Sequence, residues 1–327
     1  MPFDEFDMPP YDAVVANSPS NESILASGFY ATLESLRPKQ WTKNSLLYVA
    51  LIFSANQAWT LSDPSYITNL FIKATIGFII FCMLSSASYL VNDVVDIKRD
   101  QLHPQKRYRA IASKRLGISK AIIISAFLVI IGLTAAALLN MWFFTVATTY
   151  TLLALAYTLK LKHIVVLDVT TLSGGFILRA VAGAIVIGVP ISPWLYACTG
   201  LGSLFVGFGK RRNELAAAGS NIVQTRNSLT RYSISGLDRL AIITAVTTLV
   251  AYILYTFTAE NLQSNVLIKL TIPIVAYGLF RYSYLVKVKM LGEFPEEVFL
   301  TDAPLTLAIG LWLIMAITTL LTSNSTL

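Results

Sequence analysis

The chain has 327 residues, of which 55% are hydrophobic and 13% are charged, and its mean hydropathy is +0.64. Soluble domains contain roughly a quarter charged residues, so this composition excludes an ordinary soluble fold. The formal net charge of +7 favours contact with anions, but basic residues also mark the cytoplasmic loops of membrane proteins. We therefore predict an integral membrane protein and expect no nucleic-acid partner.

The N-terminal segment differs in composition from the rest of the chain. Residues 1–36 are polar and acidic, and they lack the basic start and apolar stretch of a secretory signal. We expect a mobile tail over residues 1–36 and a single transmembrane catalytic domain over residues 37–327.

Long apolar runs follow one another along the transmembrane domain. Crossing the hydrocarbon core takes roughly 20 residues of helix, and most of these runs have about that length. They are continuously apolar, whereas barrel strands alternate, so the sequence predicts an all-α fold. Asn140 separates the third and fourth runs into a tight hairpin. The nine predicted spans are residues 44–58, 67–91, 119–139, 141–159, 166–188, 192–209, 238–258, 266–286 and 303–322.

The positions of lysine and arginine predict the topology, because these residues are retained on the cytoplasmic side of short loops. They lie before the first span, between the second and third, and after the fourth, sixth and eighth, whereas the opposite loops contain none. This places the N terminus in the cytoplasm and, with nine spans, the C terminus outside. Lys73 and Lys269 are near enough to outer span ends to reach the headgroups, while Arg179 lies deeper.

Cysteine and histidine give no sign of redox or zinc chemistry. Cys82 and Cys198 lie inside apolar runs, where a thiol behaves as a small hydrophobe. His103 and His163 stand in interfacial loops without companions at metal-binding spacing, so we do not expect zinc.

An acidic segment follows the second predicted span. If the helix continues, Asn92, Asp96 and Asp100 share one face because they are spaced by four, with Asp93 beside them. Carboxylates that converge in this way repel one another unless a counter-ion is present. Mg2+ prefers oxygen ligands and is commonly held by one or two carboxylates together with substrate phosphates. We predict a Mg2+ site at these four residues; the alternative is a solvated helix end whose acids pair with the basic residues that follow.

Basic segments on the same side of the membrane are suited to bind phosphate oxygens. Pro104 breaks the helix after the acids, so the basic residues behind it can fold back over them. Taken one at a time, each basic segment is most simply a set of retention charges, but together with the acids they have the pattern of a metal-and-phosphate site. The candidate substrate-binding residues are Lys43, Lys106, Arg107, Arg109, Tyr157, Lys160, Lys162, Asp168, Lys210 and Arg211.

The fifth predicted span contains two ionisable residues and a small-residue segment. Asp168 begins the span; it either ligands a metal, accepts a hydroxyl hydrogen bond, or favours the positive start of the helix. Arg179 is costly at its depth unless it is paired or hydrated, so we expect either structural pairing or the lining of a cavity. The segment Ser173-Gly-Gly175, with Gly183 and Ala184 further on, permits close helix packing.

The acidic and basic motifs together resemble those of a known family. The segment Asn92-Asp-Val-Val-Asp-Ile-Lys-Arg-Asp100 is similar to the NDxxDxxxD metal motif of the UbiA superfamily of intramembrane prenyltransferases. The resemblance implies nine helices around a cavity that opens to the cytoplasm. Many members carry a second paired-aspartate motif, of which only Asp168 remains here, and this departure favours the phosphoribosyl-transferring branch. The other similar segments are residues 37–44, 103–107, 157–160, 167–183 and 209–212.

The resemblance implies a Mg2+-dependent transferase at the cytoplasmic face of the plasma membrane. The 5-phosphoribosyl group would move from phosphoribosyl diphosphate to a polyprenyl phosphate such as decaprenyl phosphate, pyrophosphate would leave, and the product would serve cell-envelope arabinan synthesis. Asn92, Asp93, Asp96 and Asp100 would hold the donor diphosphate through Mg2+. An oligomeric assembly of this protein is compatible with these predictions.

Two other functions stay open from the sequence. Prenyl transfer from a polyprenyl diphosphate to an aromatic or other acceptor would use the same aspartates. A transporter would place paired ionisable groups and broken helices near the midplane of the membrane. Most ionisable residues here crowd one surface instead, and Arg179 is the exception.

Overall fold

The computed structural model describes residues 21–190, 192–218, 228–259, 266–292 and 295–322. Within these ranges the chain is helical apart from turns and one isolated β-bridge, which confirms the predicted all-α fold. The long helices are α2 (Asn21–Leu36), α4 (Pro64–Val95), α6 (Ile118–Leu139), α7 (Met141–Leu159), α8 (Leu167–Ile187), α9 (Pro193–Ala218), α10 (Ile234–Thr258), α12 (Ile272–Lys287) and α14 (Ala303–Thr322). The short elements are η1 (Pro38–Tyr48), α3 (Val49–Phe53), α5 (Ile97–Leu102), η2 (Lys106–Tyr108), η3 (Leu161–His163), η5 (Leu229–Arg231), α11 (Val266–Leu270) and α13 (Pro295–Thr301).

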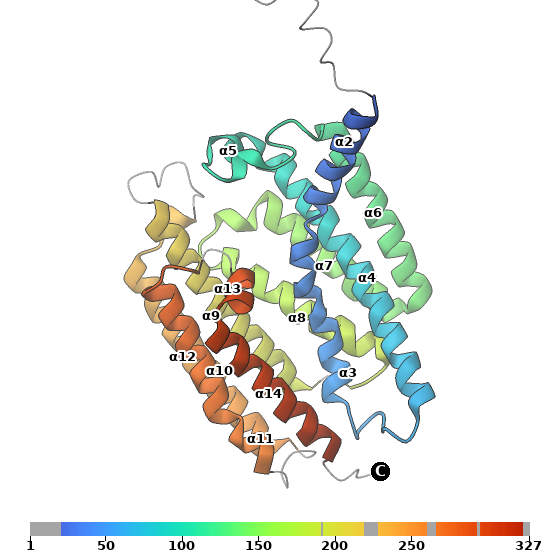
Figure 1. The fold of residues 1–327 in the computed structure, drawn as a ribbon, viewed down its shortest axis with the longest axis vertical. Helices are drawn as coiled ribbons and strands as arrows, with labels where there is room; N and C mark the ends of the chain where they lie inside the picture. Colours follow the sequence, from blue (N-terminus) through green and yellow to red (C-terminus); the bar gives the residue numbers. More distant parts are fainter. Residues whose placement is uncertain (1–20, 191, 219–227, 260–265, 293–294, 323–327) are drawn as a thin grey trace, which may run out of the picture.

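Seven helical segments of the described chain are long and apolar enough to cross a membrane. They are α4, α6, α7, α8, α10, the pair α11 and α12, and α14. Figure 1 shows most of these long helices running between the same two ends of the molecule. On α6, the apolar side chains of Ile123, Phe127 and Ile130 are more than half exposed, which suits a surface in contact with lipid.

Two of the nine predicted spans take other forms. The span expected over residues 44–58 is instead the end of the 3-10 helix η1 followed by α3, which has five residues. The residues of η1 are largely polar, so the apolar stretch that follows is too short for a regular crossing helix. The span expected over residues 192–209 lies in α9, which runs on through charged residues to Ala218 and is not among the seven. The count of nine and the side of the N terminus therefore stay predictions.

The N-terminal segment differs from the mobile tail that we expected. Residues 1–20 lie outside the described part of the chain, but residues 21–36 form α2, which packs against α4. Ala31 of α2 is fully buried in a cluster with Leu90, Ala110 and Ile111. Composition did not reveal this packing because the loop that completes it lies about 80 residues further along the chain.

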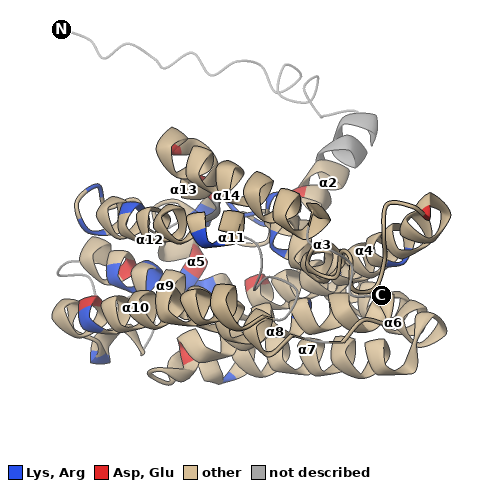
Figure 2. Cartoon of the chain, turned by 90° about the horizontal axis from the view of Figure 1, so that it is seen from below, with Lys and Arg blue, Asp and Glu red and all other residues tan. Residues whose placement is uncertain are grey.

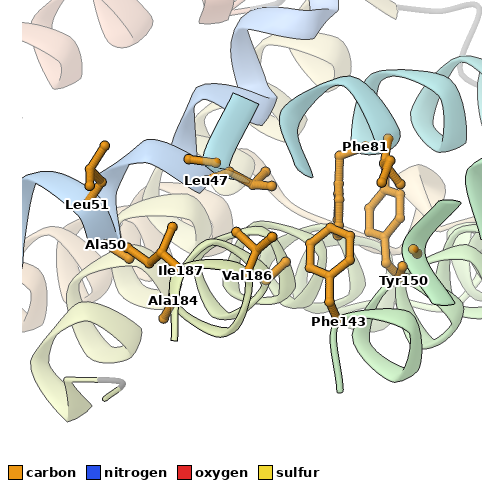
Figure 3. Packing of buried hydrophobic residues seen from close by; sticks show 14 of the residues in the cluster. Leu47, Ala50, Leu51, Phe81, Phe143, Tyr150, Ala184, Val186 and Ile187 are labelled. Atoms are coloured by element: carbon orange, nitrogen blue, oxygen red, sulfur yellow. The ribbon is translucent and has the colours of Figure 1, made fainter. Parts of the chain in front are cut away.

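An apolar core joins η1 and α3 to α4, α7 and α8 (Figure 3). Phe81 of α4 contacts Phe143 and Tyr150 of α7, with ring centroids 5.8 and 5.1 Å apart. η1 crosses α8 so closely that a Cβ atom at position 183 would lie 2.2 Å from the carbonyl oxygen of Leu47. Glycine at position 183 thus permits the close packing that the sequence predicts there. This packing holds η1 beside α4, and the acidic segment begins in the last turn of α4.

Candidate active site

The acidic segment lies where α4 passes into α5, at the upper end of the molecule in Figure 1. The helical hydrogen bonds continue across the junction: the N–H of Asp96 donates to the carbonyl of Asn92, and the N–H of Asp100 donates to the carbonyl of Asp96, each at 2.9 Å. The side chains of Asp93, Asp96 and Asp100 are all buried. The four predicted metal-site residues therefore lie on one nearly continuous helix.

Lys162 reaches this helix from η3, just after α7. Its side chain is fully buried, and its ammonium group donates to a carboxylate oxygen of Asp96 at 2.7 Å and to Oδ1 of Asn92 at 3.2 Å. Asn92 and Asp96 are four residues apart and so present neighbouring side chains to the same cation. A buried ammonium group persists only when it is paired in this way. Arg99 adds a longer ion pair to Asp96 at 3.6 Å.

Two arginines contact the other acids. The guanidinium group of Arg109 donates to Asp100 at 2.7 Å and to Asp93 at 3.2 Å. Arg37, which immediately precedes η1, also forms an ion pair with Asp93. The guanidinium carbon of Arg37 lies 5.0 Å from the centre of the Tyr89 ring. Arg109 from the basic loop thus joins Asp93 to Asp100, and Arg37 from the N-terminal side adds a second cation at Asp93.

The acids form two bridged groups, one at Lys162 and one at Arg109, rather than the single face of three that their spacing predicts. Asp93 and Asp100 are seven residues, or about two turns, apart, so one guanidinium group can bridge them along one side of the helix. Among the described residues, no three His, Cys, Asp or Glu side chains gather into one metal-binding group. Buried oxygen donors in small groups still fit Mg2+, which needs only one or two carboxylates when substrate phosphates complete its ligands.

The basic loop after the acids folds back over them through one residue. Arg109 makes the contacts described above, as Pro104 and the basic sequence behind it predict. Arg107 is exposed, and its guanidinium group donates to the hydroxyl of Tyr108 at 2.6 Å. Lys106 is half-buried in η2. The loop therefore presents one arginine to the acids and another toward solvent.

A second buried polar cluster surrounds Asp168 at the start of α8. The hydroxyl of Tyr232 donates to Oδ1 of Asp168 at 2.7 Å, and Nε of Arg211 lies 2.8 Å from Oδ2. Of the three roles that the sequence allows for Asp168, the structure thus shows the acceptance of a hydroxyl hydrogen bond. Burial, together with this hydrogen bond to a carboxylate, raises the pKa of the Tyr232 phenol, which keeps it a neutral donor.

Arg211 is buried between acids and a tyrosine. Besides Asp168 it forms an ion pair with Glu214, one turn further along α9, and donates to the hydroxyl of Tyr157 at 3.2 Å. The side chains of Arg211 and Asp168 are at most 1% exposed. Three predicted substrate-binding residues, from α7, α8 and α9, therefore meet in one cluster.

Ser228 connects the two clusters. Its hydroxyl donates to the backbone carbonyl of Lys162 at 2.9 Å and lies 3.4 Å from Oδ2 of Asp168. Ser228 is itself fully buried. The Lys162–Asp96 pair and the Asp168 cluster consequently belong to one buried polar network.

The remaining predicted substrate-binding residues are more accessible. Lys43 in η1 is half-buried and donates to Gln40, Lys160 is exposed at the end of α7, and Lys210 is half-buried on α9 beside Arg211. Figure 2 shows blue and red segments adjoining one another around α5 and α9, whereas α6 and α7 are mostly tan. The acids and bases of the candidate site are therefore concentrated in one part of the helix bundle.

Comparison with known proteins identifies the family of this protein. A profile of the UbiA prenyltransferase family matches residues 46–293. The chain belongs to the UbiA prenyltransferase family. This confirms the resemblance carried by the acidic motif, and it favours an enzyme over the transporter that the sequence left open.

Relatives of this UbiA protein include enzymes with curated names. The decaprenyl-phosphate phosphoribosyltransferase of Mycolicibacterium smegmatis is 30% identical over 308 residues, which cover 91% of this chain and 93% of the relative. The enzyme of the same name from Corynebacterium glutamicum is 31% identical over 284 residues, covering 86% and 83%. Among solved structures, a UbiA homolog from Archaeoglobus fulgidus bound to GPP and Mg2+ has a TM-score of 0.65 at 16% identity and covers 89% of this chain and 99% of that chain. The protein is thus a UbiA-fold, multi-pass membrane transferase.

Deeper in the UbiA fold, Arg179 joins several helices. Its Nε donates to Oδ1 of Asn44 at 2.7 Å, Nη2 donates to the hydroxyl of Tyr150 at 2.8 Å, and Nη1 donates to the carbonyl of Gly175 at 3.0 Å. The amide of Asn44 continues the network to Ser85 of α4 at 3.3 Å. Structural pairing, one of the two roles predicted for Arg179, is what the structure shows.

Four residues of the UbiA site were not singled out from the sequence. The sequence could have indicated a role for Arg37, because this basic residue lies on the predicted cytoplasmic side and in a segment similar to the superfamily. Glu214 follows the basic run of residues 210–212, where a lone acid forms no pattern. Ser228 and Tyr232 come from the connection between α9 and α10, where an isolated serine and tyrosine form no pattern.

Proposed function

We propose that this UbiA enzyme transfers the 5-phosphoribosyl group from phosphoribosyl diphosphate to a polyprenyl phosphate, with decaprenyl phosphate as the first candidate, and releases pyrophosphate. The observation that carries the proposal is the close interleaving of carboxylates and cations at the end of α4, where Arg109 contacts both Asp93 and Asp100. The 30% identity to the phosphoribosyltransferase of M. smegmatis supports this choice of substrates.

The proposed site lies at the cytoplasmic face of the plasma membrane, in a bundle of nine spans with a cytoplasmic N terminus. The distribution of basic loops supports this orientation. The sugar donor is water-soluble and the acceptor is anchored by its isoprenoid tail, so the reaction requires a site where water meets the bilayer. In this proposal the lipid product serves the synthesis of cell-envelope arabinan.

The donor diphosphate would be held at the acidic segment. Asn92, Asp93, Asp96 and Asp100 would bind Mg2+, which supplies charge neutralisation for the diphosphate when it is bound. Arg109 lies close enough to these acids to turn one of its donors toward the phosphates, and charge-assisted bonds from arginine to phosphate are strong and directional. Lys106 and Arg107 would add positive potential from the same loop.

The reaction needs no general base. An oxygen of the acceptor phosphate attacks C1 of the ribose, the bond from C1 to the diphosphate breaks, and pyrophosphate leaves with the bonding electrons. The acceptor phosphate is already an anion at neutral pH. Asp168 accepts from Tyr232 and pairs with Arg211, so its carboxylate is engaged in holding the site. Catalysis then rests on positioning and on the stabilisation of charge.

The acceptor phosphate would meet the more accessible cations. Lys162 and Arg211 are buried against carboxylates, and in this proposal they hold the shape of the site. Lys43, Lys160 and Lys210 have more exposed side chains and would bind the phosphate of the lipid. Their flexible ammonium groups suit a headgroup that has to arrive and leave laterally.

A second candidate is prenyl transfer from a polyprenyl diphosphate to an aromatic acceptor. The fold likeness to a UbiA homolog bound to GPP and Mg2+ favours it. A double-label experiment separates the two reactions: the enzyme is given phosphoribosyl diphosphate labelled in the ribose, polyprenyl phosphate, labelled polyprenyl diphosphate and an aromatic acceptor. Ribose label in the extracted lipid supports the first proposal, and prenyl label on the aromatic acceptor without ribose label in the lipid contradicts it.

A further inference from the structure

Arg37 occupies an unusual place at the acidic segment. Its guanidinium group pairs with Asp93, which lies 56 residues further along the chain. Its backbone has φ 54° and ψ 61°, in the left-handed region that residues with a Cβ atom adopt rarely. Such a conformation persists when the surrounding contacts enforce it. The fold therefore places this arginine at Asp93 against the preference of its own backbone.

A series of polar contacts holds the backbone of Arg37 in place. The indole N–H of Trp41 donates to the hydroxyl of Ser86 at 3.0 Å, and that hydroxyl donates to the carbonyl of Leu36 at 2.8 Å. These bonds tie the chain on both sides of Arg37 to α4. The side chain of Arg37 is 23% exposed and that of Arg109 is 28% exposed, whereas Asp93 is 4% exposed. The backbone at Arg37 is fixed, but both arginine side chains keep access to solvent.

The carboxylates of the acidic segment are already neutralised by protein cations. Asp93, Asp96 and Asp100 face Arg37, Arg109 and Lys162 at contact distance, and Arg99 adds a longer ion pair to Asp96 at 3.6 Å. A divalent cation that bound alone would displace an arginine from its carboxylate and leave excess positive charge in a partly buried site, which is unfavourable. A diphosphate that bound together with the cation would give each displaced guanidinium group a new anionic partner.

We propose that Arg37 and Arg109 are exchangeable counter-ions, which turn from the carboxylates of Asp93 and Asp100 to the donor diphosphate when those carboxylates take up a divalent cation. Arg37 is then a diphosphate-binding residue as well as a partner of Asp93. The inference rests on the proposed function only in that the donor carries a diphosphate. Its consequence is coupling: the metal and the diphosphate each raise the affinity of the site for the other by the same factor.

The coupling is measurable without turnover. Purified protein in lipid nanodiscs is titrated with Mn2+ as the probe metal, with and without inorganic pyrophosphate, and bound Mn2+ is followed by electron paramagnetic resonance. Protein-free samples correct for the complex that Mn2+ forms with pyrophosphate in solution. For the wild-type protein we expect pyrophosphate to tighten Mn2+ binding by about tenfold or more, within the usual range of coupling between sites.

Arg37→Gln distinguishes counter-ion exchange from a structural role. The variant leaves Asp93 with less positive charge, so bare Mn2+ should bind about threefold to tenfold more tightly, and the tightening by pyrophosphate should shrink by a similar factor. Arg37→Lys keeps the charge and should behave more like the wild type. Arg115→Gln is the matched control: Arg115 pairs with Glu34 of α2 at 2.7 Å, so its loss loosens α2 without removing charge from the acids. It should leave both affinities at the wild-type values.

Unchanged Mn2+ and pyrophosphate binding in a folded Arg37→Gln protein would overturn the proposal, and so would a loss of both affinities that Arg115→Gln reproduces. If Arg37→Gln fails to fold, Arg109→Gln serves as the second variant, because Arg109 shares Asp93 with Arg37 and also contacts Asp100. It should likewise tighten the binding of bare Mn2+ and weaken the effect of pyrophosphate. Coupled binding in a protein that transfers no phosphoribosyl group would refute the proposed function and leave the exchange intact.

Discussion

The ammonium group of Lys162 lies 2.7 Å from a carboxylate oxygen of Asp96, and the lysine side chain is fully buried. This pair joins η3 to the end of α4, and Ser228 ties the same lysine backbone to the Asp168 cluster. The residue that makes this buried ion pair therefore also connects the two clusters of the candidate site. Removing one partner of such a pair leaves an uncompensated charge.

Lys162→Met should destabilise the protein by about 3–5 kcal/mol, because Asp96 and Asn92 lose their shared cation in a buried setting. Unfolding by chemical denaturant in detergent measures the loss. Combining Lys162→Met with Asp96→Asn should cost less than the sum of the two single changes, since the double variant buries no unpaired carboxylate. Strict additivity would show that the pair does not couple the two elements.

Asp96→Asn should lower phosphoribosyl transfer per folded molecule by about a hundredfold or more, because the donor site loses a carboxylate that would hold the metal. It should also lower the melting temperature, because the buried ammonium group of Lys162 loses its ion-pair partner. Initial rates and the melting temperature are compared with the wild type. Glu34→Gln is the control, since Glu34 is an exposed acid whose partner is Arg115. Retained turnover in a well-folded Asp96→Asn preparation would remove Asp96 from the metal site.

Gly183→Ala should destabilise the fold by about 1–3 kcal/mol or more, because the added methyl group would lie 2.2 Å from the carbonyl oxygen of Leu47 and push η1 away from α8. Gly310→Ala is the matched control: it lies within α14, and no atom stands within 4 Å of its added Cβ. That change should be neutral or slightly stabilising, as alanine in a helix usually is. Equal melting temperatures for the two variants would contradict the close crossing.

Tyr232→Phe should cost about 1–2 kcal/mol at pH 8, because Asp168 loses a buried hydrogen bond. The pKa of the Tyr232 phenol is raised in the folded protein, so its contribution is fully present below its ordinary pKa of about 10 and is lost as the pH rises above that value. Melting curves from pH 8 to 11 should therefore converge for the two proteins. Tyr277→Phe, at an exposed position on α12, should show no such convergence.

The length of the apolar runs predicted the helices that cross the membrane. The helices α4, α6, α7, α8, α10 and α14 fall close to their predicted spans. η1 differed because its polar residues make their contacts with α4 and α8 rather than with lipid, and α2 differed because a distant loop buries its apolar face. Those contacts depend on tertiary structure and leave no local pattern.

Residue types predicted a site of carboxylates and cations, but they did not predict which acid pairs with which base. The spacing of four groups Asp100 with Asn92 and Asp96, whereas in the structure Asp100 shares Arg109 with Asp93. Lys162 is buried in an ion pair with Asp96, a contact that its place in a basic segment did not predict. A single sequence gives the charges on one side of the membrane, and the tertiary fold decides which charges meet.

The most direct test incubates purified protein with Mg2+, decaprenyl phosphate and phosphoribosyl diphosphate, and examines the extracted lipid by mass spectrometry. The account predicts a lipid heavier by one phosphoribosyl unit, formed together with pyrophosphate and lost when EDTA removes the metal. An unchanged decaprenyl phosphate, with the same folded preparation consuming a polyprenyl diphosphate and prenylating an aromatic acceptor, would contradict it.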